Sequence, residues 1–323
     1  MAVSDRLRRI FRRSSFSGGD IPPSGESRSA TPEDASALAA RLPAITLQAE
    51  RIAASLTAGL HGQRRSGQGE SFWQYRPAQP GEPANRIDWR QSARSDRAWV
   101  RETEAESAGT VLLWCDLSAS MRWRSADVLP EKQDRALLML LAAGIALHRG
   151  GERVRLLSPD GPAGLPPGGT FASRLAAGWA MMADASGAGQ HSLPDQAILP
   201  RNARLVVASD FLCTVEETAS FLQHVTSSGN AAHLLQIMDP AEETLPWTGH
   251  MRFTGMEGEE AVVLPDVSAM RADYEALLQA RETLLMRHAT ESGHGIILHR
   301  TDSAPETALL TLHQQMSGRF SGG

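Results

Sequence analysis

From residue 110 onward, the chain alternates short apolar segments with longer segments of helical periodicity. This alternation restricts the fold more than any other feature of the sequence. The first apolar segment, T-V-L-L-W-C at 110–115, is typical of a strand buried on both faces of a sheet. Strands alternating with helices predict an α/β fold, doubly wound around a mainly parallel sheet with helices on both faces. Further strands are expected at 153–157, 204–208, 232–238 and 295–299, and helices at 131–149, 172–183, 215–228, 267–291 and 305–316. Two small hairpins are also expected, one placing an edge strand near 162–165 and one joining 251–254 to 261–264.

The N-terminal third has a different composition and is expected to add a mixed helix and β insertion. A helix should begin at Thr31, with Pro32 in its first turn, and run to about residue 41; a second apolar segment covers 45–60. Residues 61–108 are rich in Gly, Arg, Pro and aromatic residues, and they predict loops and short strands. We therefore expect three parts: a disordered basic tail and linker at 1–30, an N-terminal subdomain at 31–108, and the α/β domain at 109–320.

Charge and composition exclude several classes of function. The chain has 32 basic and 37 acidic residues, a formal net charge of −5, which gives no bulk field for binding nucleic acid. Its two cysteines, Cys115 and Cys213, do not have zinc-site spacing. No apolar stretch approaches the length of a membrane span and no signal peptide opens the chain, so we expect a cytoplasmic protein. The arginine-rich segment 3–13 is either a frayed tail or a short helix making weak contact with an anionic membrane surface or a partner. The sequence carries no signal for an oligomeric state.

Hydroxyl and carboxylate side chains follow the predicted strands where ligands bind in open parallel sheets, beyond the carboxyl ends of the strands. Such oxygens suit Mg²⁺ or Mn²⁺ and not zinc. The alternative for the D-x-S-x-S pattern alone is a capped turn, because Asp and Ser are common at helix starts. Thr170 and the pair Ser209-Asp210 lie in two later loops at the matching positions of the predicted sheet, which favours a metal site. The candidate ligands are Asp116, Ser118, Ser120, Thr170 and Asp210.

These five residues resemble the metal-ion-dependent adhesion site of von Willebrand factor A domains, in which an acidic residue of the ligand usually completes the metal's coordination. The segment upstream resembles a bacterial family, domain of unknown function 58 (DUF58), through Y-R-P-A-Q-P-G-E at 75–82, R-I-D-W at 86–89 and S-A-R at 92–94. Glu82 departs from the aspartate usual in that family. The residues of this segment form either a structural clamp on the core or a face that recognises a partner: Tyr75, Glu82, Arg86, Asp88, Trp89 and Arg94.

The resemblance implies a von Willebrand factor A-like, Rossmann-type fold and a non-catalytic role. In that role the protein would be an adaptor for a MoxR-type AAA+ ATPase in chaperone-like assembly or maturation of other proteins. The ATPase or a client protein would present a carboxylate to the metal. One alternative is a Mg²⁺-dependent, phosphatase-like hydrolase with Asp116 as nucleophile, although the haloacid-type pattern needs aspartate where Ser118 stands. The other alternative is a purely structural subunit that holds no metal. No G-x-S-x-G elbow is present, so no catalytic residue is expected.

Overall fold

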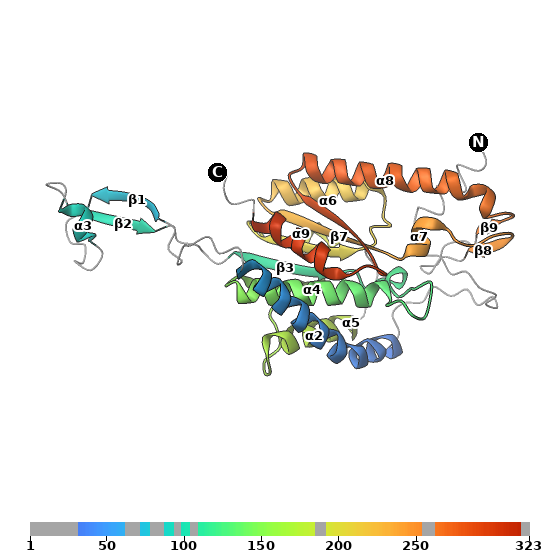
Figure 1. Ribbon diagram of the computed structural model, residues 1–323, viewed down its shortest axis with the longest axis horizontal. Helices are drawn as coiled ribbons and strands as arrows, with labels where there is room; N and C mark the ends of the chain where they lie inside the picture. Colours follow the sequence, from blue (N-terminus) through green and yellow to red (C-terminus); the bar gives the residue numbers. More distant parts are fainter. Residues whose placement is uncertain are drawn as a thin grey trace. The chain divides into compact units, whose positions relative to one another are not determined.

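The computed structural model describes residues 32–61, 72–77, 87–93, 98–103, 109–184, 192–253 and 262–317. These residues divide into two compact units. The larger unit holds the described residues up to Thr57 and from Thr110 onward, and the smaller unit holds those between Ala58 and Gly109. The two units are drawn in Figure 1, and each is described by itself below.

A six-stranded sheet forms the centre of the larger unit, in the order β10-β7-β6-β3-β4-β5. Five strands are parallel and the short edge strand β5 runs antiparallel to β4, so the mainly parallel α/β fold predicted from the sequence is confirmed. The chain proceeds from β3 to β4 on one side and from β6 to β7 and β10 on the other. The strand order therefore reverses between β3 and β6. The strands are β3 (Thr110–Cys115), β4 (Arg153–Ser158), β5 (Gly161–Ala163), β6 (Arg204–Ser209), β7 (Ala231–Met238) and β10 (Gly295–Arg300).

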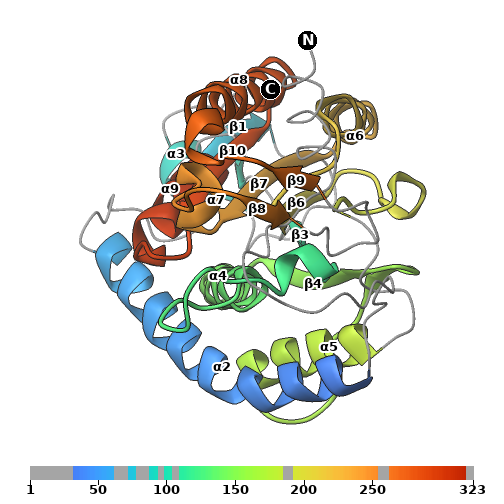
Figure 2. The same cartoon turned by 90° about the vertical axis from the view of Figure 1, so that its right-hand side faces the viewer.

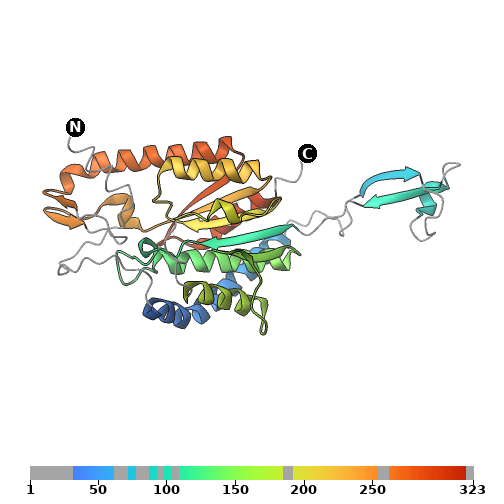
Figure 3. The same cartoon turned by 180° about the vertical axis from the view of Figure 1, so that it is seen from behind.

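Helices cover both faces of this sheet (Figures 1 and 2). One face carries α4 (Lys132–Arg149), which packs with α5 (Phe171–Asp184), α9 (Pro305–Ser317) and α2 (Pro32–His61) in one apolar cluster. The opposite face carries α6 (Val215–Ser227) and α8 (Arg271–Glu291), which lie side by side in Figure 3 as well. This two-sided cover explains why the central strands β3, β6 and β7 are buried along most of their length.

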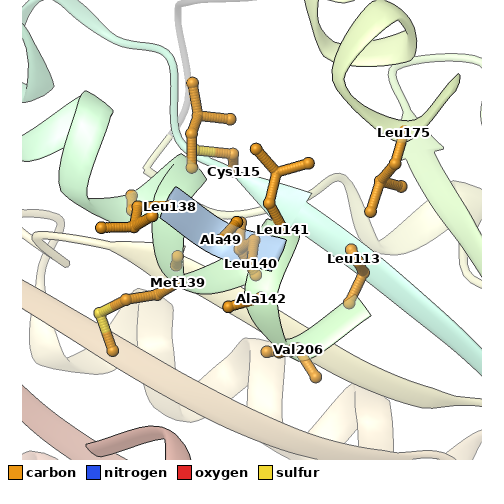
Figure 4. Packing of buried hydrophobic residues seen from close by; sticks show 14 of the residues in the cluster. Ala49, Leu113, Cys115, Leu138, Met139, Leu140, Leu141, Ala142, Leu175 and Val206 are labelled. Atoms are coloured by element: carbon orange, nitrogen blue, oxygen red, sulfur yellow. The ribbon is translucent and has the colours of Figure 1, made fainter. Parts of the chain in front are cut away.

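Helix α4 is buried almost all round because it lies between the sheet and the outer helices. Figure 4 shows its residues 138–142 packed among side chains of the sheet, α5 and α2. At Gly144 the helix lies close to β3 and α5: an added Cβ would lie 2.8 Å from Leu113 Cδ1 and 2.8 Å from Leu175 Cδ2. A side chain at position 144 would require Leu113 and Leu175 to shift, so glycine favours this deep position of the helix.

Helix α2 differs from the prediction of two separate segments, because it is one continuous helix of 30 residues with Pro43 inside it. A proline in a helix removes one backbone hydrogen bond and usually ends or kinks the helix. Here the helix has apolar anchors in the core on both sides of the proline, Leu38 and Leu42 before it and Ala49 and Ile52 after it. Packing of these side chains outweighs the missing hydrogen bond. The prediction that the helix begins at Thr31 lies outside the described residues, as does the arginine-rich segment 3–13.

A second, smaller apolar cluster lies in the segment that joins β7 to α8. It contains α7 (Pro240–Thr244) and the antiparallel hairpin of β8 (Met251–Phe253) and β9 (Val262–Leu264), which confirms the second predicted hairpin. The side chains of Trp123 and Tyr274 also belong to this cluster. Figure 1 shows α7, β8 and β9 together beside the first turns of α8. The cluster places α7 directly after the carboxyl end of β7.

The smaller unit contains an antiparallel pair of strands, β1 (Phe72–Pro77) and β2 (Trp99–Thr103), and the short helix α3 (Trp89–Ser92). The backbone N–H of Asp88 donates to the carbonyl of Trp99 at 2.8 Å, which joins the R-I-D-W segment to β2. No described helix of either unit is long and apolar enough to cross a membrane.

Candidate functional site

Asp116 and Asp210 lie next to each other because they follow the two neighbouring strands at which the strand order reverses. Asp116 follows β3 and Asp210 follows β6, and the register pairs Cys115 with Ala208. The backbone N–H of Asp116 donates to the carbonyl of Ala208 at 2.9 Å, which extends the ladder by one step. Ligand sites in open α/β sheets lie at this kind of reversal. The predicted convergence of the two loops is therefore present.

Hydroxyl groups join the two carboxylates into one buried network. The Oδ1 atom of Asp116 accepts the backbone N–H of Ser118 at 2.8 Å, and its Oδ2 atom accepts the hydroxyl of Ser209 at 2.7 Å. The Oγ atoms of Ser118 and Ser120 lie 2.9 Å apart. The hydroxyl of Ser120 donates to Oδ2 of Asp210 at 2.7 Å. None of these five residues is more than 3% exposed, so the network is withdrawn from water.

The loop after β6 holds Asp210 through an unusual backbone conformation. Phe211 has a φ of 52°, in the left-handed region that a bulky residue rarely adopts. Its N–H donates to the Ser209 hydroxyl at 2.9 Å, and its carbonyl accepts the guanidinium of Arg281 from α8. The same guanidinium donates to the carbonyl of Cys213 at 2.6 Å. Non-glycine residues in this conformation cost on the order of 1–3 kcal/mol and cluster at functional sites, where the surrounding contacts hold them.

Two buried charged residues that sequence reasoning did not assign to the site also belong to it. Lys132, at the start of α4, places its Nζ atom 2.9 Å from Oδ2 of Asp210 and 2.7 Å from Oε1 of Glu242. Lys132 is 0% exposed and Glu242 is 4% exposed. Glu242 is fixed by the capping box of α7, in which its Oε2 atom accepts the N–H of Asp239 at 2.9 Å. Two sequence signals could have pointed to this pair. Lys132 is the chain's only lysine, and Glu242 shares a capping box with Asp239, which directly follows a core strand.

Burial and like charge raise the proton affinity of this site. Burial raises the pKa of Asp116 to about 7, and the charge of Asp210 adds to the shift, while hydrogen bonds from Ser118 and Ser209 oppose it. Burial also raises the pKa of Glu242, against the opposing effect of Lys132. For Lys132, burial lowers the pKa, but the carboxylates of Asp210 and Glu242 outweigh it, so the pKa is raised and the ammonium stays charged. With all groups ionised, three carboxylates against one ammonium leave a formal charge of −2.

No described hydrogen bond joins Thr170 to the network of Asp116 and Asp210. Thr170 is exposed and begins the first turn of α5, where its Oγ1 atom accepts the N–H of Ser173 at 3.2 Å. The hydrogen bonds of its hydroxyl, to Ser173, are thus local. Its role as a ligand stays a prediction, whereas the structure brings Asp116, Ser118, Ser120 and Asp210 together.

The candidate clamp residues are described only in part. Tyr75 lies on β1 opposite Arg101 of β2, and the Oδ1 atom of Asp88 accepts the N–H of Arg90 at 3.1 Å. Trp89 is 62% exposed on α3. Glu82, Arg86 and Arg94 lie outside the described residues. The choice between a clamp and a recognition face therefore stays a prediction.

Comparison with solved structures gives two chains of low similarity. One is a conserved hypothetical protein BatB from Bacteroides thetaiotaomicron, 12% identical, with 65% of this chain and 97% of that chain covered and a TM-score of 0.36. The other is an aerotolerance-related membrane protein from Bacteroides fragilis with multiple mutations to serine, 14% identical, with 65% and 98% covered and a TM-score of 0.37. No curated protein matches the chain.

The family comparison covers more than half of the chain. Residues 74–283 match the family described as protein of unknown function DUF58. The matched range includes the R-I-D-W segment, both carboxylates of the buried network, and Lys132 with Glu242. This chain therefore belongs to the DUF58 family.

Proposed function

We propose that this protein is a non-catalytic module that binds a partner protein through a divalent cation held at the ends of β3 and β6. One observation carries the proposal: two buried carboxylates and a pair of serine hydroxyls converge at the point where the strand order reverses. The side-chain atoms of these carboxylates and serines that could bind a cation are all oxygens, the ligands that Mg²⁺ and Mn²⁺ prefer. The residues that would hold the cation are Asp116, Ser118, Ser120 and Asp210, with Thr170 as the fifth predicted ligand.

The spacing of the oxygens fits such an ion. Mg²⁺ binds octahedrally with ligands at about 2.05 Å, which places neighbouring ligand oxygens about 2.9 Å apart. The Oγ atoms of Ser118 and Ser120 lie 2.9 Å apart, and Oγ of Ser120 lies 2.7 Å from Oδ2 of Asp210. Three oxygens are thus held close to the spacing of neighbouring ligands. Among the described residues, no three His, Cys, Asp or Glu side chains form a group that could hold a metal, so a cation here would depend on the hydroxyls.

Charge supports the same proposal. With their carboxylates ionised, the buried groups carry a formal charge of −2, and isolated buried charge is costly. A divalent cation would neutralise this charge and supply a Lewis-acidic centre that accepts a carboxylate oxygen. The resemblance to von Willebrand factor A domains suggests that a partner's acidic residue supplies that oxygen. Through the DUF58 resemblance we propose a MoxR-type AAA+ ATPase, or its client, as the partner, with assembly or maturation of other proteins as the outcome.

The test is a binding measurement with the full chain and a MoxR-type ATPase from the same genome. Binding should be lost in EDTA, restored by excess Mg²⁺, and absent in Asp116→Ala. Asp195→Ala is the matched control, because Asp195 only caps a short helix, its Oδ1 atom accepting the N–H of Ala197. An affinity that stays the same in EDTA and in Asp116→Ala would refute metal-dependent binding.

Two observations favour a second candidate, a structural subunit whose site holds no metal. The ammonium of Lys132 already contacts Asp210, and the network is at most 3% exposed. The metal content of the purified protein separates the two candidates. Bound Mg²⁺ or Mn²⁺ near one equivalent, lost in Asp116→Ala but kept in Asp195→Ala, supports the first candidate; no metal after dialysis against millimolar Mg²⁺ and Mn²⁺ supports the second.

A further inference from the structure

We propose that Lys132 is a resident counter-ion that competes with the divalent cation for Asp210 and thereby sets how tightly this site holds metal. The inference rests on the cation site proposed above and adds the residue that determines its affinity. It depends on three observations: which oxygen the ammonium contacts, what prevents the ammonium from leaving, and how the charges add up.

The ammonium contacts an oxygen that the cation needs. The Oδ2 atom of Asp210 accepts both the Lys132 ammonium, at 2.9 Å, and the Ser120 hydroxyl, at 2.7 Å. A carboxylate oxygen offers about two lone pairs, so both are in use. The other oxygen, Oδ1, accepts the N–H of Leu212 at 3.2 Å. The Ser120 hydroxyl can turn its proton away when its own oxygen binds a cation, but the ammonium carries only donors. A cation that bonds Oδ2 therefore meets Lys132 as its competitor.

The ammonium also has no route away from the site. Lys132 is 0% exposed, and its second contact, Oε1 of Glu242 at 2.7 Å, is buried too. Glu242 is itself held by the capping box of α7, where its other oxygen accepts the N–H of Asp239. The hydroxyl of Tyr274 donates to the Glu242 carbonyl, which ties α7 to α8. Lys132 can shift its hydrogen bond from Asp210 toward Glu242, but its positive charge stays near the metal.

A positive charge held this close lowers cation affinity, and the two partners of Lys132 have opposite effects. Replacing Lys132 by methionine removes the charge and changes the formal charge of the site from −2 to −3. Replacing Glu242 by glutamine leaves the ammonium to Asp210 alone and changes the formal charge to −1. Even at an effective dielectric constant near 20, one elementary charge within a few ångströms of a divalent ion changes its affinity by at least about tenfold.

The experiment is a titration of the full chain with MnCl₂ by calorimetry after removal of metal with EDTA, at fixed pH and salt. Lys132→Met should bind Mn²⁺ at least tenfold more tightly than wild type, and Glu242→Gln at least tenfold more weakly. Arg135→Met is the matched control, because Arg135 lies on the same helix but donates to the carbonyls of Thr301 and Ser303. Its Mn²⁺ affinity should equal that of wild type.

A double variant keeps the test decisive if Lys132→Met fails to fold. Lys132→Met with Glu242→Gln removes both charges of that pair, so Glu242 is not left as a buried unpaired charge and only Asp210 loses its ammonium. It should bind Mn²⁺ more tightly than wild type, because the lost ammonium contacts Asp210 directly and the lost carboxylate lies beyond it. A Mn²⁺ affinity equal to or below that of wild type in the folded variants that lack Lys132 overturns the role of Lys132.

The outcomes also separate this inference from the proposed function. Wild-type binding that the Lys132 variants do not strengthen refutes the competition and leaves the cation site in place. Binding by the Lys132 variants but not by wild type supports the competition and refutes a metal-dependent role for the natural protein. No Mn²⁺ binding by any of the folded proteins refutes both.

Discussion

Replacing Lys132 by methionine should destabilise the metal-free protein strongly, because it leaves buried carboxylates without their cation. Methionine keeps most of the buried stem, so the change removes the charge with little loss of packing. The ammonium has two contacts, 2.9 Å to Asp210 and 2.7 Å to Glu242, and all three residues are at most 4% exposed. Removing one partner of a buried ion pair costs about 3–5 kcal/mol. Since domains are stable by about 5–15 kcal/mol, this is a large share of the total.

The measurement is the free energy of unfolding in urea, in EDTA at pH 7.5, followed by circular dichroism. We expect a loss of about 3–5 kcal/mol for Lys132→Met and a smaller loss, about 1–2 kcal/mol, for Lys132→Met with Glu242→Gln, where fewer carboxylates remain unpaired. A loss below about 1 kcal/mol for the single variant would show that these carboxylates do not depend on the ammonium. A double variant less stable than the single one would contradict the pairing of Lys132 with Glu242.

Three further predictions concern other parts of the fold. Burial and the charge of Arg135 lower the pKa of His299 from 6.5 to about 4. As the pH falls from 6.5 to 4, the histidine is protonated in the unfolded state before it is in the folded state, so the free energy of unfolding falls by up to about 3 kcal/mol. In His299→Leu, the free energy of unfolding measured in urea should depend less on pH across that range. Gly144→Ala should lower the free energy of unfolding by about 1–2 kcal/mol, because the added Cβ would crowd Leu113. This loss should exceed the gain from the better helix propensity of alanine, and chemical denaturation measures the difference. Asp239→Ala should cost about 1 kcal/mol and speed amide exchange at Ser125, whose N–H donates to the Asp239 carboxylate at 2.9 Å.

Much of the larger unit could be predicted from the sequence because its strands and helices have strong local signals. The strand of Thr110–Cys115 has the predicted bounds, and the long helix α4 begins within one residue of its prediction. Helix α2 was divided wrongly at Pro43, because the local cost of a proline is visible in a sequence while the compensating core contacts of Leu42 and Ala49 are tertiary. The five-residue helix α7 was missed, because so short a helix has little periodicity.

The site residues likewise differ in how far the sequence could place them. Asp116 and Asp210 could be placed together because topology alone fixes where parallel strands end. The distance between two adjacent strand ends is set by backbone pairing, so no side-chain detail was needed. Thr170 belongs to a loop that no strand register fixes, and its side chain caps α5 in this structure.

The roles of Lys132 and Glu242 could not be predicted in this way, because neither residue belongs to a loop motif. Lys132 begins a helix whose neighbouring residues pack into the core, and a lysine there reads locally as a solvated helix end. Its burial becomes intelligible only when Asp210 and Glu242, 78 and 110 residues away, are placed around its ammonium. A fully buried lysine needs such partners, since the free energy of burying an isolated charge is prohibitive. The chain's only lysine thus places one compact ammonium against two buried carboxylates, and the wider, planar guanidinium of arginine would not be an equivalent replacement there.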